Sequence, residues 1–554
     1  MSVVKESMLD NIEALLKEYK HYSNEEITKI KNEAKRYGRG IIDYLIEIKK
    51  DLDEDEILNF FSRRYNIPKI EDVSNKKIIK KSDYYIIYDG NEIGISFPAY
   101  RHILSEKYPD YKIGLIKYSV IRGGNYEEEG IKGDFINLEK DAKNLNVTDI
   151  HFSNKDFGGV IHYRLLGDLV EVKTMKKDYV VKFLKVIKNL ASEFTPGFDP
   201  EEYRQPQDAR IEIEELKLGN RINFTPSLYE GRQNFVIRLI NKEQKRIKGI
   251  EDLYNLGYLK EDAEKILSYS QLNTGLIIMS GATGSGKSKT FNTLLALLPK
   301  TKKIVSAEDP VEYKLDNAVQ HQTLEFIKKE AGKDKLVKVG YMEYMRAFMR
   351  QDPDIIFIGE WRKDKELTES LVYASETGHL VFTTLHSSRV INVPNLLITQ
   401  YGLMPTDLTN NVKLLINQRL IKKVCPYCGK KHIVTDEEID EIKKIIWFKD
   451  KDKLDILKGK EIFMPGDGCE KCIIKDFSGK ILSKGYIRRT AIYEYLPFDD
   501  EVKDLLLSTT STNEIEKILI KKSKENEAKT FTDVVVEKAL NKELDIASIK
   551  EGLL

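Results

Sequence analysis

Short apolar runs alternate with stretches of helical spacing along the second half of the chain. Four runs have the length of a strand: Gly275–Ser280, Lys303–Ala307, Ile355–Ile358 and Leu380–Thr384. Apolar runs of this length, separated by helical patterns, are typical of a mostly parallel sheet that is covered on both faces. We therefore predict an α/β domain over residues 251–554.

The preceding residues predict two further domains. In residues 1–130, Glu56–Asn66 has the pattern of a helix that ends before Pro68, and Tyr84–Tyr88 and Lys112–Ile116 resemble strands. We expect a small α/β domain there. Residues 131–242 contain stretches in which polar and apolar positions alternate, which predicts an α+β domain with a substantial sheet. The highly charged stretch Lys242–Ile250 is expected to be a hinge.

Charge and composition exclude some functions. Lys and Arg total 90 and Asp and Glu total 89, so the formal net charge is +1. This balance does not indicate a nucleic-acid-binding protein, although it leaves a local basic patch open. The N-terminal residues have no apolar signal region, and no apolar run approaches the ~18 residues of a membrane span. We expect a soluble, cytosolic protein whose contact with any membrane is peripheral or through a partner.

One glycine-rich turn matches the phosphate-binding pattern GxxxxGK[ST]. Its residues are Gly281, Ala282, Thr283, Gly284, Ser285, Gly286, Lys287 and Ser288. It follows an apolar run and precedes a helical pattern, which is the context that this motif requires. Backbone N–H groups would surround the phosphates of ATP, Lys287 would neutralise the β- and γ-phosphates, and Ser288 would ligate Mg²⁺. The alternative is a glycine-rich turn with a chance lysine.

Acidic residues follow two other predicted strands. Glu360 comes just after Ile355–Ile358, where ligands bind in open α/β sheets. It is a candidate to contact the Mg²⁺ shell or to orient the attacking water. Glu308 and Glu312 belong to an acidic box after the strand that contains Ile304. For each acid the alternative is a solvated turn residue.

Several motifs together resemble the secretion ATPase superfamily, which includes the assembly motors of type IV pili and of type II secretion systems. Besides the phosphate loop, the resemblance rests on three stretches: the acidic box Glu308–Glu312, the segment Met345–Asp354 before Glu360, and the histidine box Thr377–His386. It covers roughly residues 135 to 500. The resemblance implies that His386, at the end of a strand, senses or stabilises the γ-phosphate.

The middle segment carries matching stretches, namely Thr148–His151, Tyr163–Asp168 and Gln205–Arg210. The resemblance implies that this domain closes over ATP and lends arginines to the phosphates. We assign that role to Arg210, Arg221 and Arg238. An arginine fork stays charged and binds phosphate bidentately. The alternative for each arginine is a surface salt bridge.

The sequence also departs from the family pattern. Lys363 stands where the family usually has an aspartate, and Ala209 and Leu166 replace a usual glycine and a usual aspartate. The stretch Leu324–Val339 is longer and more basic than expected. These departures indicate a divergent branch and leave the nucleotide-binding core untouched.

All four cysteines fall in two CxxC pairs: Cys425 and Cys428, and Cys469 and Cys472. Four thiolates satisfy a tetrahedral Zn²⁺ in a closed structural site. The alternatives are four reduced structural cysteines or, less favoured, an oxidoreductase motif. The stretch Gly485–Glu494 also resembles the assembly motors, whereas the related retraction motors generally lack this zinc module and the additional N-terminal domain.

The resemblance thus implies a RecA-like P-loop ATPase core over residues 251–554 with a zinc-binding insertion over 424–495, a PAS-like middle domain over 131–242 and a docking domain over 1–130. It implies a cytosolic hexamer at the inner membrane that hydrolyses ATP and drives a platform protein. Glu360 would polarise or position the water, with Glu308 and Glu312 as alternatives. The alternative functions are a retraction motor, a DNA-translocating motor or helicase, and an adaptor that binds a cyclic dinucleotide near Arg36, Gly38 and Arg39.

Overall fold

The computed structural model describes most of the chain. The described residues are 12–36, 41, 44–45, 53–70, 78–81, 85–88, 92–95, 98–116, 126–227, 232–242, 247–330, 333–445, 448–476 and 478–553. Its contacts divide the chain into two compact units. The first comprises Met1–Asn144, Lys155–Gly159 and Met175–Leu190, and the second comprises Leu145–Asn154, Val160–Thr174 and Ala191–Leu554. We describe each unit by itself.

The first unit contains a four-stranded sheet and helices. The strand order is β1 (Ile78–Lys81), β2 (Tyr85–Tyr88), β3 (Glu92–Ile95) and β4 (Lys112–Leu115). The helices before and between the strands are α2 (Asn24–Arg36), α4 (Glu54–Tyr65) and α5 (Tyr100–Lys107). The predicted helix and both predicted strands are confirmed. The helix α4 begins with a capping box at Asp53 and ends at Asn66 in the left-handed conformation, before Pro68 is reached.

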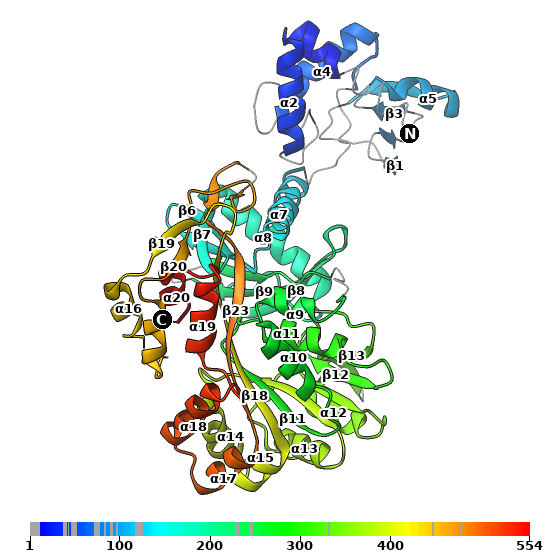
Figure 1. Ribbon diagram of the computed structural model, residues 1–554. Helices are drawn as coiled ribbons and strands as arrows, with labels where there is room; N and C mark the ends of the chain where they lie inside the picture. The colour runs from blue at the N-terminus through cyan, green and yellow to red at the C-terminus, as the bar shows by residue number, and fades with distance from the viewer. Residues whose placement is uncertain are drawn as a thin grey trace. The chain divides into compact units, whose positions relative to one another are not determined.

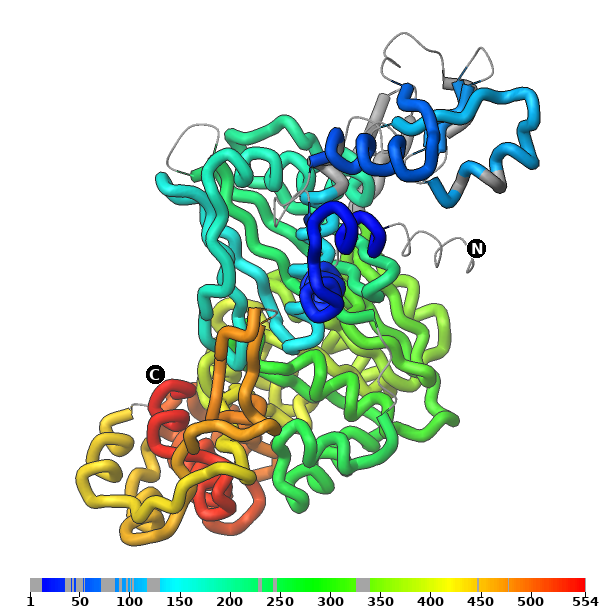
Figure 2. Tube along the Cα trace, turned by 90° about the horizontal axis from the view of Figure 1, so that it is seen from above, coloured from blue at the N-terminus to red at the C-terminus, as the bar shows by residue number. Residues whose placement is uncertain are grey.

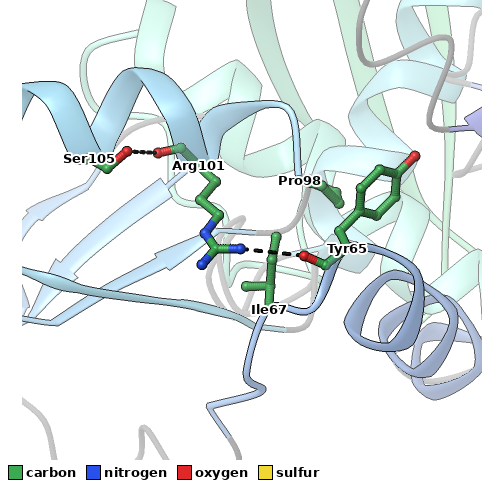
Figure 3. A pocket seen from close by; sticks show the side chains of 5 residues that line it. All are labelled: Tyr65, Ile67, Pro98, Arg101 and Ser105. Atoms are coloured by element: carbon green, nitrogen blue, oxygen red, sulfur yellow. Dashed lines mark hydrogen bonds between the residues drawn. The ribbon is translucent and has the colours of Figure 1, made fainter.

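A shallow pocket lies between the end of α4 and the start of α5. It is lined by Tyr65, Ile67, Pro98, Arg101 and Ser105 (Figure 3). The guanidinium of Arg101 donates hydrogen bonds to the carbonyls of Tyr65 and Asn66 at 3.4 and 3.3 Å. The arginine therefore closes the carboxyl end of α4.

Two long helices complete the first unit. They are α7 (Tyr126–Asn144) and most of α8 (Lys177–Phe194). Phe135 of α7 packs edge-to-face on Phe183 of α8, with ring centroids 6.3 Å apart. Both rings are fully buried, so this contact belongs to the core of the unit.

A six-stranded sheet occupies the middle of the chain. Its strand order is β7 (Asp168–Lys176), β6 (Gly158–Leu165), β5 (Asp149–Lys155), β10 (Gln233–Arg238), β9 (Leu218–Pro226) and β8 (Gln207–Ile213). The alternating stretches at Gly159–Leu165 and Phe235–Leu239, from which the sheet was predicted, form strands β6 and β10. In β9 and β10 every second side chain is buried, which is the pattern of a sheet with one covered face.

A seven-stranded sheet forms the centre of the second unit. Its order is β13 (Ala318–Gln322), β12 (Ile304–Glu308), β16 (Ile355–Ile358), β17 (Leu380–Leu385), β11 (Gly275–Ser280), β18 (Val412–Val424) and β23 (Tyr486–Pro497). Six strands run parallel, and β23 is antiparallel to β18. The four strands predicted from the apolar runs are therefore confirmed.

Helices cover both faces of this sheet, as predicted. Alternate side chains of β11 enter two different apolar clusters: Ile277 and Met279 join one, and Leu276 and Ile278 join the other. The helices around the sheet include α10 (Lys260–Tyr269), α11 (Lys287–Ala296), α12 (Tyr341–Phe348), α13 (Lys365–Glu376), α14 (Val393–Tyr401) and α15 (Pro405–Asn411). The carboxyl ends of the parallel strands meet at one edge, where the candidate residues lie.

The strands β18 and β23 continue past the sheet as a two-stranded ribbon (Figure 1). The ribbon leads to the cysteine pairs and to the short strands β19 (Lys430–Ile433), β20 (Glu461–Met464), β21 (Ile474–Lys475) and β22 (Ile481–Ser483). The C-terminal helices are α17 (Asp500–Ser508), α18 (Thr512–Lys524), α19 (Phe531–Leu540) and α20 (Ile546–Leu553). Figure 2 shows α19 and α20, in red, beside the cysteine-bearing segment, and α19 contacts β20.

Three further stretches concern the sequence predictions. The long basic stretch forms a hairpin of β14 (Leu324–Glu330) and β15 (Lys333–Val339). Residues 243–246 of the predicted hinge, and Gly38 and Arg39 near the end of α2, lie outside the described residues. Among the described residues, no helix combines the length and the apolar character needed to cross a bilayer.

Candidate functional site

The phosphate-loop motif connects β11 to α11. All six residues of β11 are buried, and α11 begins at Lys287, so the loop joins a core strand directly to a helix N-terminus. Ala282, Thr283 and Gly284 are exposed on the outer side of the loop. Gly284 and Gly286 have φ angles of 77° and 87°, in the left-handed region that glycine adopts without strain. The backbone thus has the shape of an anion-binding loop.

Lys287 turns back into this loop. Its Nζ donates hydrogen bonds to the carbonyl oxygens of Gly281 and Ala282, at 2.8 and 3.1 Å. Burial lowers the pKa of Lys287 to about 8, while the charges of Glu360 and Glu312 oppose this shift. The amine therefore lies within the loop and carries less charge than an exposed lysine. Ser288, the next residue, is half-buried in the first turn of α11.

Glu360 and His386 meet at the same edge of the sheet. Glu360 follows β16, His386 follows β17, and His386 Nε2 lies 3.4 Å from Glu360 Oε1. On its other side, His386 Nδ1 lies 3.2 Å from the carbonyl oxygen of Gly281. A carbonyl oxygen accepts only, so Nδ1 must carry hydrogen in this contact. The imidazole therefore lies between the carboxylate of Glu360 and the first residue of the phosphate loop.

The two glutamates of the acidic box have different surroundings. Glu308, at the end of β12, is buried and accepts hydrogen bonds from Ser306 Oγ at 2.7 Å and Gln320 Nε2 at 3.0 Å. Burial raises the pKa of Glu308. Burial also raises the pKa of Glu312, while the charges of Arg238 and Lys287 oppose the shift. Of these two acids, Glu312 is thus the one whose charge interacts with the loop lysine.

Asp309 and Arg362 complete the cluster, and the sequence had not nominated them. Asp309 Oδ1 lies 3.4 Å from Arg221 Nη1, and Asp309 Oδ2 lies 3.3 Å from Arg362 Nη2. Arg362 also donates through Nε to Glu360 Oε2 at 3.0 Å. Asp309 belongs to the acidic box, but no spacing rule shows that Arg362 bridges this box to Glu360.

The three predicted arginines lie in one row. Arg210 of β8 pairs with Arg221 of β9, and Arg221 pairs with Arg238 of β10. Directly paired residues of antiparallel strands project from the same face. Arg238 Nε contacts Asp149 Oδ1 at 3.1 Å, whereas the side chain of Arg210 has no ion pair among the described residues. Like charges placed side by side are unfavourable unless acids or a bound anion compensate them.

The four cysteines form one cluster. All four sulfur atoms lie within 4.8 Å of one another, with Sγ–Sγ distances of 3.8 Å for Cys425–Cys469 and 3.5 Å for Cys428–Cys472. Four thiolates placed tetrahedrally about 2.3 Å from a zinc ion are separated by about 3.8 Å, so the donor set fits zinc. Cys425 follows β18 directly, and its backbone N–H donates to the carbonyl of Gly485, just before β23, at 2.9 Å. The cluster therefore closes the far end of the ribbon.

Comparisons with known proteins agree with this arrangement. The family model described as "Type II/IV secretion system protein" matches residues 128–545. The chain is 30% identical over 362 residues to "Type II secretion system protein E" of Dickeya dadantii, covering 64% of this chain and 63% of that protein. It is 31% identical over 396 residues to "Type IV pilus assembly ATPase PilB" of Myxococcus xanthus, covering 69% and 61%.

The matched region thus spans less than two thirds of the length of these curated relatives. Among solved structures, the "X-ray structure of the Yersinia pseudotuberculosis ATPase DotB" has a TM-score of 0.50 at 18% identity, covering 76% of this chain and 93% of that one. At this identity the likeness concerns the fold alone, and it supports the mixed α/β sheets described above.

Proposed function

Because this chain belongs to the type II/IV secretion system protein family, we propose that it is an ATP hydrolase that powers assembly of a type IV pilus or of a type II secretion pseudopilus. The observation that carries the proposal is that Lys287 and His386 both contact the carbonyl oxygen of Gly281. On its other side, the ring of His386 lies 3.4 Å from Glu360. Three separate β-strands contribute to this arrangement. In this proposal the seven-stranded sheet is a RecA-like ATPase core.

ATP would bind with its phosphates in the loop Gly281–Ser288. Lys287 would leave the carbonyls of Gly281 and Ala282 and pair with the β- and γ-phosphates, while the hydroxyl of Ser288 would hold Mg²⁺. The ion, when bound, neutralises developing charge on the phosphates. The fit of the loop to phosphate is supported by its glycine φ angles and by the helix that begins at Lys287.

Glu360 is the proposed residue that positions the attacking water. It lies at the end of β16, where Arg362 Nε donates to its Oε2 and His386 Nε2 lies 3.4 Å from its Oε1. Such a fixed carboxylate can orient water without reorganising. Glu312 is the alternative, because its charge interacts with that of Lys287. Glu308 is the weaker alternative, because its hydrogen bonds run to Ser306 and Gln320.

The arginine row is proposed to sense the nucleotide. Arg221 already reaches the acidic box through Asp309, and the charge of Arg238 interacts with that of Glu312. An arriving γ-phosphate would compete with these acids for the arginines and pull the middle domain, residues 131–242, toward the core. The charged stretch near residues 242–250 would be the hinge. We further propose that the chain acts as a homo-hexamer, as the family resemblance implies.

The remaining parts are proposed to serve docking. Residues 1–130 and the zinc module over residues 424–495 would contact an inner-membrane platform protein from the cytoplasm. Zinc would be structural, because four thiolates fill a tetrahedral shell and leave no open position. A nucleic-acid partner is not expected, since the net charge is only +1.

The proposal is tested by ATP hydrolysis of the purified protein with magnesium. Lys287→Ala and Glu360→Gln should each lower kcat/KM by about 100-fold or more, as loss of a transition-state contact does. Matched controls are Lys300→Ala and Glu369→Gln, which make the same changes at exposed positions and should retain the wild-type rate. Wild-type hydrolysis by both site variants would refute the assignment. A rate that DNA stimulates, with a steep dependence on salt, would favour a DNA-translocating motor instead.

A further inference from the structure

We propose that Gln418, in the middle of β18, is a positioning residue that sets the shape of the phosphate loop from beneath. The inference rests on the proposed function, because its effect is measured on ATP binding. Gln418 lies outside the phosphate loop, the acidic residues and the histidine box. It is 1% exposed and therefore cannot reach a ligand bound on the outer side of the loop.

Three hydrogen bonds connect Gln418 to separate parts of the site. Its Nε2 donates to the carbonyl oxygen of Ser285 at 2.6 Å. Its Oε1 accepts from the hydroxyl of Thr290, in the first turns of α11, at 2.8 Å, and from the hydroxyl of Tyr258. One side chain thus joins the loop, the helix after it and the connection between α9 (Glu251–Leu256) and α10.

The carbonyl of Ser285 fixes the orientation of the amide, because a carbonyl oxygen accepts only and must face the NH₂ group. If the amide were turned over, its NH₂ group would face two hydroxyls and its oxygen would face the carbonyl of Ser285. Burial raises the pKa of Tyr258, so its hydroxyl keeps the proton that it donates. The ring of Tyr258 stacks on that of Tyr493 at 4.4 Å between centroids, and Tyr493 in turn donates to Asp262 Oδ2 at 2.6 Å. Tyr258 is therefore held firmly enough to hold Gln418 in place.

Two glycines of the motif lie directly against Gln418. A Cβ at Gly281 would lie 2.5 Å from the backbone carbonyl oxygen of Gln418, and a Cβ at Gly286 would lie 2.9 Å from the side-chain Nε2 of Gln418. Both glycines also have φ angles of 149° and 87°, which other residues adopt only with strain. The loop therefore wraps over Gln418 at a distance that only glycine permits.

This arrangement assigns Gln418 an effect on binding rather than on the chemical step. The hydrogen bond from Gln418 holds the carbonyl of Ser285 in place, so the loop backbone at Ser285 is ordered before ATP arrives. Without that bond the loop must be ordered when the nucleotide binds, which weakens affinity. Gln418 contacts none of the three acids proposed to position the water. The rate of hydrolysis in the bound complex, kcat, should therefore change little.

The test compares Gln418→Met, Tyr258→Phe and the double variant with wild type. We expect Gln418→Met to raise KM and the equilibrium dissociation constant of MgATP about tenfold, with kcat within about twofold of wild type. Tyr258→Phe should raise KM and the dissociation constant of MgATP a few-fold. The double variant should be no worse than Gln418→Met, because Tyr258 acts through Gln418. The matched control is Gln400→Met, at an exposed position of α14.

Several outcomes would overturn the inference. They are an unchanged KM in Gln418→Met, a loss confined to kcat, and additive effects in the double variant. If Gln418→Met does not fold, the double variant Tyr258→Phe with Thr290→Val removes both hydroxyl donors to the amide oxygen of Gln418, so that the amide is no longer held in place. It should raise KM at least as much as Tyr258→Phe, and an unchanged KM would overturn the inference. Absence of ATP binding by wild type would refute the proposed function itself, whereas wild-type binding with an unaffected Gln418→Met would refute only this inference.

Discussion

The first prediction is that Lys287 takes up a proton when ATP binds. In the structure its amine is buried on the carbonyls of Gly281 and Ala282, and this burial lowers its pKa to about 8. Against an ordinary lysine value of 10.5, the difference corresponds to about 3 kcal/mol that disfavours the charged form. Triphosphate needs the charged form. The bound complex should therefore take up a proton that part of the free protein lacks.

The size of this effect follows from the pKa. At pH 8 about half of the free protein would hold neutral Lys287, so about half a proton should be taken up for each nucleotide bound. Between pH 7 and pH 9 the neutral fraction rises from about one tenth to about nine tenths, and the apparent affinity should fall about tenfold. The sign is fixed, because the bound state carries more protons and is weakened as the pH rises.

Isothermal titration calorimetry at pH 8 with magnesium and a non-hydrolysable ATP analogue measures the uptake directly, without heat or protons from hydrolysis. The binding heat is measured in two buffers of different ionisation enthalpy, and the slope gives the number of protons. Lys538 needs a control, because burial also lowers its pKa to about 8. Its Nζ donates to Thr490 Oγ1 at 2.8 Å, away from the phosphate loop, so Lys538→Gln should leave the proton uptake intact.

Two results would contradict the reasoning. The first is a binding heat that does not depend on the buffer at pH 8, which would mean that Lys287 is fully charged before ATP binds. The second is an affinity that stays constant from pH 7 to pH 9. In the variant Lys287→Arg the guanidinium stays charged over this range, so any residual binding should occur without proton uptake.

Three further predictions concern the surroundings of the site. Arg389→Met leaves Glu494 and Glu516 buried without their cation and should lower the free energy of unfolding in urea by about 3–5 kcal/mol; a loss below about 1 kcal/mol would contradict it. Cys428→Ser should reduce bound zinc well below one ion per chain by mass spectrometry, and full occupancy would count against a four-thiolate site. Asp149→Asn frees Arg238, whose side chain is half-exposed, and should lower KM for ATP by at most about threefold; a raised KM would show that the pair helps binding.

Local patterns in the sequence predicted the local structure. The strand β11 and the loop after it could be predicted from the sequence, because the apolar run, the glycines and the lysine are contiguous. The cysteine cluster was also visible, since its chemistry requires four thiolates and the chain has four cysteines. The strands that carry Glu360 and His386 were predicted with their ends, and parallel strands bring such ends to one edge.

Contacts between distant residues could not be predicted in this way. The register that aligns Arg210, Arg221 and Arg238 depends on the turns between three strands, and no local pattern reports it. Gln418 and Tyr258 are 160 positions apart, and the strand that contains Gln418 was not among those predicted from the sequence. A buried polar residue inside such a strand is the one signal that was available, because it must find hydrogen-bond partners.

The position of His386 has its own structural cause. Arg389, three residues further on, is buried and donates to Glu494 on β23 through Nε and Nη2, and to Glu516 on α18 through Nη1. Burying three charges costs much of what their attraction returns, so an apolar cluster would stabilise the fold equally well. Unlike an apolar cluster, the hydrogen bonds of Arg389 hold their partners in one orientation. They fix the loop that carries His386 to β23, and β23 pairs with β18, from which Gln418 supports the phosphate loop. The histidine and the loop it contacts are thus held by the same two-stranded ribbon.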